Sequence, residues 1–348
     1  MERPLVDLKG KSPEELEAFI ASLGKQRFRT KQIVKWMYGR GVNSFGEMTD
    51  LSRAFREDLG KIAYVSSLKE ISRAEASDGT VKFLFQLEDG ERVESVLIFE
   101  GRRRTVCVSS QVGCPLGCAF CATGQMGFVR DLTAGEIVDQ LICARRVCWE
   151  QGENVTNVVL MGMGEPLLNY ENVLKAVRLM GLEEGISLGA RKITLSTAGI
   201  LPQVMRLADE GLKVGLAISL NATTDALRSR LMPVNRRYPI SGLMNAARAF
   251  ARKTRRRVTI EYVLIEGLND SAADAERLVE LVHGMPCKIN LIGVNPNAGS
   301  PYQPPMAETI EQFREILVSH YLTAFVRGSK GSDIAAACGQ LRTGTTRL

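Results

Sequence analysis

The sequence predicts an α/β protein whose main part is an open or partial barrel, with parallel strands inside and helices outside. The first observation is periodicity: between residues 103 and 326, six short apolar runs alternate with longer amphipathic stretches, as β/α units in series do. The second observation is length, because 348 residues can form one large domain and a small additional one.

The predicted barrel strands are short runs of mainly apolar residues. The candidates are Thr105–Ser109, Asn157–Met161, Lys192–Ser196, Gly215–Leu220, Thr259–Ile265 and Lys288–Ile292. Helical periodicity is found between them, in stretches such as Ala134–Val147, Glu171–Met180, Pro202–Glu210, Ser241–Arg252 and Ala272–His283. In folds of this kind the ligand lies at the carboxyl ends of the strands, so we expect the site at that edge.

Residues 1–62 are predicted to form a small helical module. Ser12-Pro13 is a typical helix start, with Ser as the N-cap and Pro at the first helical position. Further helices are expected near Thr30 and from about Leu51.

The same module carries a basic stretch. Six basic and no acidic residues lie between Lys25 and Arg40, interleaved with Phe28, Trp36 and Tyr38. Basic side chains neutralise phosphates, and aromatic rings stack on bases or fill a small core. We interpret most of the aromatic residues as core and the basic face as a contact surface for RNA.

Residues 63–102 are predicted to form a short β extension, followed by the barrel at 103–326 and a tail at 327–348. Val81–Phe85 and Val93–Phe99 have the composition of strands, and Asp89-Gly90 between them is a hairpin signal. From these residues alone, Glu94 is interpreted as a solvated carboxylate on an edge strand.

Composition indicates an ordinary cytoplasmic protein with metal or redox chemistry. Hydrophobic residues make up 45% and charged residues 24%. No apolar run approaches the roughly 20 residues that span a bilayer, and the N-terminus has no signal-peptide pattern. Eight cysteines in such a chain suggest metal or redox chemistry more than a disulfide framework.

The most specific motif is C-x3-C-x2-C, formed by Cys114, Cys118 and Cys121. Structural zinc takes four protein ligands, whereas three thiolates on a four-iron cluster leave one iron open to a substrate. The open iron is what a radical S-adenosylmethionine enzyme uses to bind its cofactor. The alternatives are a zinc knuckle with Cys107 as fourth ligand, or three unrelated buried thiols. We favour the cluster, because this spacing differs from those of zinc sites and ferredoxins.

Small and polar residues follow successive barrel strands at the same edge. Together they form a plausible site for a nucleoside-bearing ligand, although each alone is an ordinary loop residue. They are Gly162-Met163-Gly164-Glu165-Pro166, Ser196, Ser219-Leu220-Asn221 and Asn295-Pro296.

Two further features lie towards the C-terminus. A second basic run, residues 252–257, is preceded by Arg228, Arg230, Arg236 and Arg237, and it is either a solvated face or a contact to phosphates. Cys338 lies among small residues of the tail, where a reactive role is worth considering. The remaining cysteines, Cys143, Cys148 and Cys287, are interpreted as packing residues.

Several long motifs resemble the radical S-adenosylmethionine methyltransferases that modify adenosine in 23S ribosomal RNA. The resemblance covers nearly the whole chain, and Pro166 is similar to the adenine-C2 enzymes (the RlmN type) and unlike the C8 resistance enzymes. The motifs are CVSSQVGCPLGCAFCATG at 107–124, GMGEPLLN at 162–169, LRSRLMPVN at 227–235 and the tail at 333–341.

The resemblance implies a partial (β/α)6 barrel of the radical S-adenosylmethionine type and a set of site residues. Cys114, Cys118 and Cys121 match the ligands of a [4Fe-4S] cluster. The positions that hold S-adenosylmethionine match Gly164, Glu165, Ser196, Ser219, Leu220, Asn221 and Asn295. Asn221 departs from the pattern, since many relatives have His there.

The resemblance also implies the chemistry and the partners. Cys338 matches the cysteine that carries the methyl group, Cys107 its disulfide partner and Glu94 a general base, which replaces the interpretation of Glu94 as solvated. Two molecules of S-adenosylmethionine are expected per turnover, as methyl donor and as radical source. The partners are 23S rRNA, tRNA as a possible second substrate, and flavodoxin with its reductase as electron donor.

Adenine C2 is electrophilic, which explains why a protein thiol would carry the methyl group. Direct transfer from a sulfonium to that carbon is unfavourable, whereas a thiolate accepts a methyl group readily. We therefore expect an adenine-C2 methyltransferase of RNA. The alternatives are methylation at C8 of the same base, or a non-catalytic zinc-containing protein that binds RNA.

Overall fold

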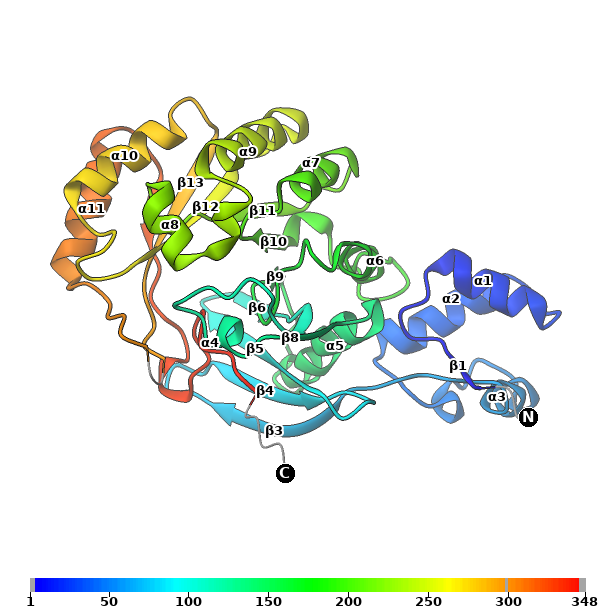
Figure 1. Cartoon of the computed structure of the whole chain (residues 1–348). Helices are drawn as coiled ribbons and strands as arrows, with labels where there is room; N and C mark the ends of the chain where they lie inside the picture. The colour runs from blue at the N-terminus through cyan, green and yellow to red at the C-terminus, as the bar shows by residue number, and fades with distance from the viewer. Residues whose placement is uncertain (1–3, 298–299, 344–348) are drawn as a thin grey trace.

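The computed structural model describes residues 4–297 and 300–343. Residues 1–3 and 344–348, the outer ends of the predicted first and last segments, lie outside the described residues. A curved ten-stranded sheet runs through the main body, with helices on its outer side, and a group of helices lies at one end of the molecule (Figure 1). The strand order is β14-β13-β12-β11-β10-β9-β6-β5-β4-β3.

Seven neighbouring strands of this sheet are parallel, and six of them are followed by helices as the periodicity predicts. The strands are β6 (Arg103–Cys107), β9 (Asn157–Leu160), β10 (Ile193–Thr197), β11 (Gly215–Ser219), β12 (Val258–Leu264), β13 (Cys287–Gly293) and β14 (Ala324–Val326). The helices are α5 (Ala134–Glu150), α6 (Tyr170–Met180), α7 (Leu201–Asp209), α8 (Asp225–Leu231), α9 (Ile240–Thr254), α10 (Ala272–Val282) and α11 (Ala307–Ser319).

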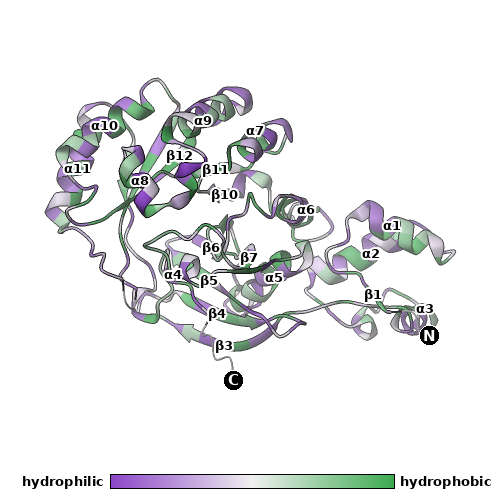
Figure 2. Cartoon of the chain, viewed as in Figure 1, coloured by the Kyte–Doolittle hydropathy of each residue, from purple (hydrophilic) through white to green (hydrophobic). Residues whose placement is uncertain are grey.

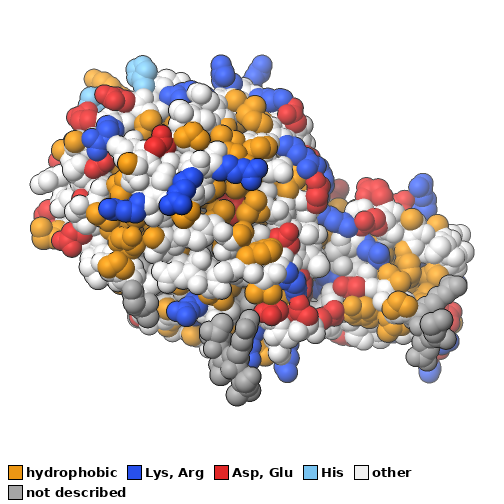
Figure 3. Space-filling view, in the orientation of Figure 1, with side chains coloured by type: hydrophobic (Ala, Val, Ile, Leu, Met, Phe, Trp, Pro, Cys, Tyr) orange, Lys and Arg blue, Asp and Glu red, His pale blue; other side chains and the backbone are white. Residues whose placement is uncertain are grey.

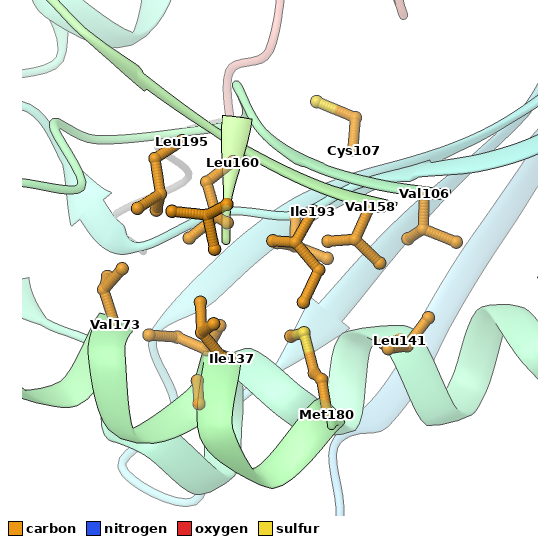
Figure 4. Packing of buried hydrophobic residues seen from close by; sticks show 14 of the residues in the cluster. Val106, Cys107, Ile137, Leu141, Val158, Leu160, Val173, Met180, Ile193 and Leu195 are labelled. Atoms are coloured by element: carbon orange, nitrogen blue, oxygen red, sulfur yellow. The ribbon is translucent and has the colours of Figure 1, made fainter. Parts of the chain in front are cut away.

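The core of the barrel lies between the sheet and these helices. Val106, Val158 and Ile193 project from neighbouring strands onto Leu141 and Met180 of the helical layer (Figure 4). Alternate residues of each strand therefore face the helices, and the others face the inside of the barrel. Helices α7, α9 and α10 each carry green and purple positions, as helices with one buried face do (Figure 2).

The β extension belongs to the same sheet. β3 (Lys69–Glu75), β4 (Val81–Gln86) and β5 (Arg92–Glu100) are antiparallel to one another, and β5 is antiparallel to β6. The predicted hairpin is thus confirmed as β4–β5. The periodicity does not reveal β3, because all its residues are exposed and four of the seven are charged, which is common for an edge strand.

Residues 6–64 form the group of helices at the end of the molecule. Parallel pairing of β1 (Val6–Asp7) with β2 (Ala63–Tyr64) joins its two ends. Between them lie α1 (Pro13–Ser22), α2 (Phe28–Val34), the π-helical turn η1 (Lys35–Gly39), the 3-10 turn η2 (Phe45–Glu47) and α3 (Arg53–Gly60). The Ser12 side chain caps α1 in a capping box with Glu15, as the sequence predicts for this helix start.

The aromatic residues of the basic stretch are mostly core, as expected. Trp36 and Tyr38 are buried, whereas Phe28 is half exposed. Cys143 and Cys148 are also buried, which agrees with their interpretation as packing residues. Among the described residues, no helix combines the length and the apolar character needed to cross a bilayer.

Candidate active site

The three cysteines of the C-x3-C-x2-C motif lie in a loop at the carboxyl edge of the sheet. The loop is held by a small hairpin of β7 (Gln111–Gly113) and β8 (Phe128–Asp131), and the short helix α4 (Ala122–Gln125) follows it. Gly113 is required here, because its φ is +73° and an added Cβ would lie 1.9 Å from the Gly127 carbonyl oxygen. The Ala119 amide donates to the Leu231 carbonyl at the end of α8, 2.9 Å away.

All three thiols line one cavity, and their chemistry suits an iron–sulfur cluster. Burial raises the pKa of Cys114 to about 12 and raises the pKa of Cys118 further, and the neighbouring thiolates add to both shifts. A positively charged group of soft metal ions would relieve this repulsion. Within the described parts of the chain, no three His, Cys, Asp or Glu side chains converge as a single metal ion requires. A cluster fits better, because it distributes its thiolate ligands over separate irons.

The cavity measures about 970 Å³ with its open mouth, and it collects most of the strand-end residues. Of the positions expected to hold S-adenosylmethionine, six line it: Gly164, Glu165, Ser196, Ser219, Asn221 and Asn295. Gly162 and Gly164 allow close packing below it, since a Cβ on either would lie within 2.8 Å of the segment Ser109–Gln111.

Glu165 is the buried acid of this cavity. Its carboxylate accepts hydrogen bonds from the Leu167 amide at 3.1 Å and the Ala198 amide at 2.7 Å. Only 3% of the residue is exposed, and burial raises its pKa to about 7 despite these donors. The carboxyl group is therefore fixed in place, and the binding of a cationic ligand beside it would favour its ionised form.

Leu220 does not line the cavity, unlike its neighbours. Its side chain is buried, its amide donates to the Glu261 carbonyl at 3.0 Å, and its carbonyl accepts from the Arg228 guanidinium at 2.9 Å. The side chain of Asn221 also has protein partners: Oδ1 accepts from the Val263 amide at 2.9 Å. These two positions support the ends of β11 and β12.

The C-terminal tail lies across the mouth of the cavity and brings Cys338 beside the cluster loop. Asn295 Nδ2 donates to the Cys338 carbonyl at 3.0 Å, and the Ala122 amide donates to the Gly339 carbonyl at 2.7 Å. Asn297 Nδ2 donates to the carbonyls of Phe120 and Gly339, at 2.9 and 3.1 Å. Three separate segments of the chain are joined here.

The Cys338 thiol lines the same cavity as the three motif cysteines. Its residue is exposed at the mouth, yet protein surrounds the thiol closely, and this burial raises its pKa to about 11, with a contribution from Glu261. Cys338 is therefore accessible to a ligand in the cavity and largely protonated at neutral pH.

Cys107 and Glu94 lie beside the cavity on the inner face of the sheet. Figure 4 shows Cys107 directed away from the helical layer that Val106 and Val158 contact. Burial raises the pKa of the Cys107 thiol, and the Cys338 charge raises it further, so the two thiols are within electrostatic range. Both are free thiols in the structure.

The interpretation of Glu94 as a solvated edge carboxylate is wrong. β5 is an internal strand, and Glu94 is only 5% exposed. Burial raises its pKa, while Lys82 and the Arg342 amide act in the opposite direction.

The interpretation of Arg228 as part of a solvated or phosphate-binding run is also wrong. Arg228 is fully buried, and its guanidinium donates to the carbonyls of Ala198 at 2.7 Å and Ser219 at 3.1 Å. It therefore fastens the ends of β10 and β11 under the cavity. Its neighbours Arg230, Arg236 and Arg237 are exposed, and Lys and Arg side chains lie over and beside α8 in Figure 3.

Glu261 is a residue of this site that sequence reasoning missed. It is buried in β12, lines the cavity, and accepts a hydrogen bond from Asn290 at 2.9 Å. The signal was a lone carboxylate inside the apolar run Thr259–Ile265, since a charged residue in a buried strand needs a partner or a function.

Comparison with known families gives two matches. The profile described as "Ribosomal RNA large subunit methyltransferase N-terminal domain" matches residues 6–65. The profile of the "Radical SAM superfamily" matches residues 108–282, which includes the three-cysteine loop and the strands β9 to β12.

Individual relatives match over nearly the whole chain. The "Dual-specificity RNA methyltransferase RlmN" of Geotalea uraniireducens is 48% identical, with 97% of this chain and 96% of the relative covered. The protein of the same name from Geobacter sulfurreducens is 47% identical, with coverages of 97% and 92%. A crystal structure of a radical SAM methyltransferase from Sphaerobacter thermophilus superposes with a TM-score of 0.94 at 47% identity, covering 97% of this chain and 99% of that one.

Proposed function

Since this chain belongs to the RlmN family of radical S-adenosylmethionine RNA methyltransferases, we propose that it methylates C2 of adenosine in RNA through Cys338. The observation that supports this route is the shared cavity: the tail cysteine and the three cysteines of the cluster loop line the same space. A thiol there can meet both the cofactor and a base that enters the mouth.

Cys114, Cys118 and Cys121 hold the [4Fe-4S] cluster in this proposal, and Gly164, Glu165 and the strand-end residues hold S-adenosylmethionine. When bound, the cluster supplies the electron that cleaves S-adenosylmethionine to the 5′-deoxyadenosyl radical. The Glu165 carboxylate suits the cationic end of this ligand, because it is fixed by two amides and gains from an opposite charge.

The protein's own side chains carry the methyl group and the protons. The Cys338 thiol loses its proton to solvent, and its sulfur attacks a sulfonium methyl group and releases S-adenosylhomocysteine. The resulting S-methyl group would later lose a hydrogen atom to the deoxyadenosyl radical. The S–CH2 radical adds to C2 of adenine and joins RNA to protein. Glu94 takes the C2 proton, and the Cys107 sulfur bonds to the Cys338 sulfur as the S–CH2 bond breaks. The released carbon keeps the electron pair of that bond and takes the proton that Cys107 gives up, which completes the methyl group on C2. One electron is left over and passes to a one-electron acceptor such as an iron–sulfur cluster.

RNA would approach the cavity across two basic surfaces. One is the basic stretch between Lys25 and Arg40 of the N-terminal helical segment, and the other is formed by Arg230, Arg236 and Arg237 beside the mouth. We infer that 23S rRNA is a substrate and tRNA a second one. The N-terminal match to a ribosomal RNA large subunit methyltransferase domain supports the first substrate, and the dual specificity for RNA in the name of the relatives supports a second. Flavodoxin with its reductase is our candidate electron donor, and a protein that acts on ribosomal RNA is expected in the cytoplasm.

The first test is product analysis. Anaerobically reconstituted protein is incubated with S-adenosylmethionine, a one-electron reductant and an RNA fragment, and the nucleosides are analysed by mass spectrometry. We expect 2-methyladenosine. The isomer 8-methyladenosine would assign the C8 reaction instead, and unmodified RNA with intact cluster and cofactor cleavage would contradict the proposal.

The two thiols give a sharper test of the route. Cys338→Ala should block turnover at the first methyl transfer, because the thiol that accepts the group is lost. In Cys107→Ala, Cys338 should still be methylated and its methylene carbon should still add to C2 of adenine. The reaction should then stop at a covalent protein–RNA adduct, which is detected as a protein mass that decreases on nuclease treatment. Cys143→Ala, on the outer side of the sheet, is the matched control and should turn over normally. Normal turnover in Cys107→Ala would remove the disulfide step.

A further inference from the structure

Lys82 lies on the inner face of the sheet, close to Glu94. In the strand register Lys82 pairs with Val96 of β5, and Val96 pairs with Cys107 of β6. Directly paired residues share a face, and so do residues two apart on one strand, so Lys82, Glu94 and Cys107 all project to the same side. Figure 4 shows that the Cys107 side faces away from the helical core.

The ammonium group of Lys82 bridges Glu94 and the tail. Nζ lies 3.1 Å from Glu94 Oε1, and it donates to the Ala335 carbonyl at 3.2 Å. The Lys82 side chain is only 18% exposed and that of Glu94 only 7%. Water and salt therefore screen the attraction between the two charges less than they would at the surface.

The second oxygen of Glu94 also contacts the tail. Oε2 accepts a hydrogen bond from the Arg342 amide at 2.8 Å. Ala335 precedes Cys338 by three residues and Arg342 follows it by four. Both carboxylate oxygens are thus connected to the tail, one directly and one through Lys82, on the two sides of the cysteine that carries the methyl group.

We propose that Lys82 is a positioning residue that holds the Glu94 carboxylate, charged and oriented, against the docked Cys338 segment. The inference rests on the proposed role of Glu94 as the base for the C2 proton. In this arrangement Glu94 reaches its working geometry only when the tail is docked. The docked tail is the state in which the proposed reaction links RNA to Cys338.

The surroundings of Glu94 support this role for Lys82. Burial raises the pKa of Glu94, and Lys82 is the nearby charge that opposes the shift. The backbone of Glu94 has neutral partners: the Ser109 hydroxyl donates to its carbonyl, and its amide donates to the Met163 sulfur. The neutral Cys107 thiol projects from the same face of the sheet. Without Lys82, the upward shift of the Glu94 pKa by burial would be opposed only by the Arg342 amide, and a smaller fraction of Glu94 would be ionised and able to accept the proton.

The step that Lys82 serves is a proton transfer. The C2–H bond of the adduct breaks, its electron pair stays on the adenine ring, and the proton forms an O–H bond with Glu94. Lys82 keeps its own proton throughout. Its contribution is to hold the carboxylate ionised before the transfer.

The test follows the protein–RNA adduct in a single turnover of Lys82→Met between pH 6 and pH 9. We expect Cys338 methylation and deoxyadenosine formation near wild-type levels. Decay of the adduct should be slowed most at the acid end of this range, by up to about tenfold, and should approach the wild-type rate as pH rises, because the loss of one close opposite charge moves a carboxyl pKa up by about one unit or more. Lys82→Arg keeps the charge and should restore most of the rate.

Lys69→Met is the matched control, since Lys69 is an exposed lysine of β3 in the same sheet, and it should behave as wild type. A wild-type pH profile in Lys82→Met would overturn the inference. So would loss of Cys338 methylation, or equal slowing at every pH, because either result assigns Lys82 to tail docking alone. Failure of the proposed function is distinct: then the wild-type protein itself forms no adduct.

Discussion

At the scale of single residues, Glu165 shows how burial prepares a group for a charged ligand. Two backbone amides hold its carboxylate, but the residue is almost wholly removed from water. Its pKa of about 7 lies above the value of about 4.3 in an unfolded chain. Between these values the folded state holds a proton that the unfolded state has lost, so the stability that Glu165 contributes falls as pH rises from about 4.3 to 7.

This shift predicts proton release on binding. At pH 6 the free protein has Glu165 mostly protonated, and the cationic amino group of S-adenosylmethionine favours the ionised form. We expect binding to release close to one proton at pH 6 and almost none at pH 8.5, with affinity increasing over that range. Calorimetry in two buffers of different ionisation enthalpy measures the released proton. Glu165→Gln should bind more weakly and release none; unchanged proton release in that variant would assign it to another group.

The residues that sequence reasoning placed wrongly are buried charges. Sequence reasoning assigned the strand residue Glu94 and the helix residue Arg228 to the surface because charged side chains are usually solvated, and that assignment fails because both lie inside the molecule. What encloses them is distant in sequence: Glu94 contacts Lys82 and the tail, and Arg228 contacts the ends of two strands. The three motif cysteines needed no such information, because their spacing is itself specific. The path of the tail over the cavity follows from no local pattern.

At the scale of elements, the barrel strands and the helices α5, α6, α7, α9 and α10 were predictable because each has its own apolar period, whereas the seven-residue α8 was not among the predicted helices. The exceptions are elements without that period. β3 is wholly exposed, and β14 has three residues of which Phe325 and Val326 are about half exposed. Both are edge strands of the ten-stranded sheet, where burial on one face is incomplete.

The region from Lys25 through α2 to Lys35 presents a basic face that can exchange its partners for phosphates. Arg27 pairs with Glu17 and Lys31 with Glu184, but the basic side chains are 84% and 72% exposed. Exposed pairs of this kind contribute only about 0–1 kcal/mol, so a phosphate can replace the carboxylate at little cost. The second basic run, residues 252–257, precedes β12 and therefore lies at the opposite edge of the sheet from the cavity.

Neutralising the first face should weaken RNA binding. In the test variant Lys25, Arg27, Lys31 and Lys35 are all changed to Gln, and we expect it to bind RNA more weakly. The slope of log affinity against log salt concentration should become shallower by up to about 3, since each phosphate contact contributes roughly 0.7–0.9 to that slope. Cleavage of S-adenosylmethionine without RNA should be unchanged. The matched control changes Arg252, Lys253, Arg255 and Arg257 to Gln. Equal losses in the two variants would indicate a general effect of charge and would contradict a specific face.

At the scale of the whole molecule, a buried ion pair joins the N-terminal segment to the barrel. Lys9 Nζ lies 2.5 Å from Asp139 of α5, and the two side chains are 1% and 4% exposed. The other oxygen of Asp139 accepts from the Leu68 amide at 2.7 Å. Beside the pair, Gly10 and Gly135 are in close contact, because a Cβ on Gly10 would lie 2.7 Å from the Gly135 nitrogen. The segment is therefore docked in one orientation.

We expect this orientation to set the distance between the bound RNA and the cavity. Lys9→Met leaves the Asp139 charge buried without its partner, which should cost about 3–5 kcal/mol of unfolding free energy. RNA methylation should decrease strongly, while RNA binding by the basic face and cleavage of S-adenosylmethionine in the barrel persist. Urea unfolding, RNA affinity and both reaction products are measured on the same preparation.

The double variant Lys9→Met with Asp139→Asn separates docking from charge. It removes both charges while the amide oxygen introduced at position 139 can still accept from Leu68, so it should regain much of the stability that Lys9→Met alone loses. If docking is what delivers RNA to the mouth, methylation should return with the stability. Recovery of stability without recovery of methylation would mean that Lys9 acts on RNA in another way, since the barrel and its cavity are then intact.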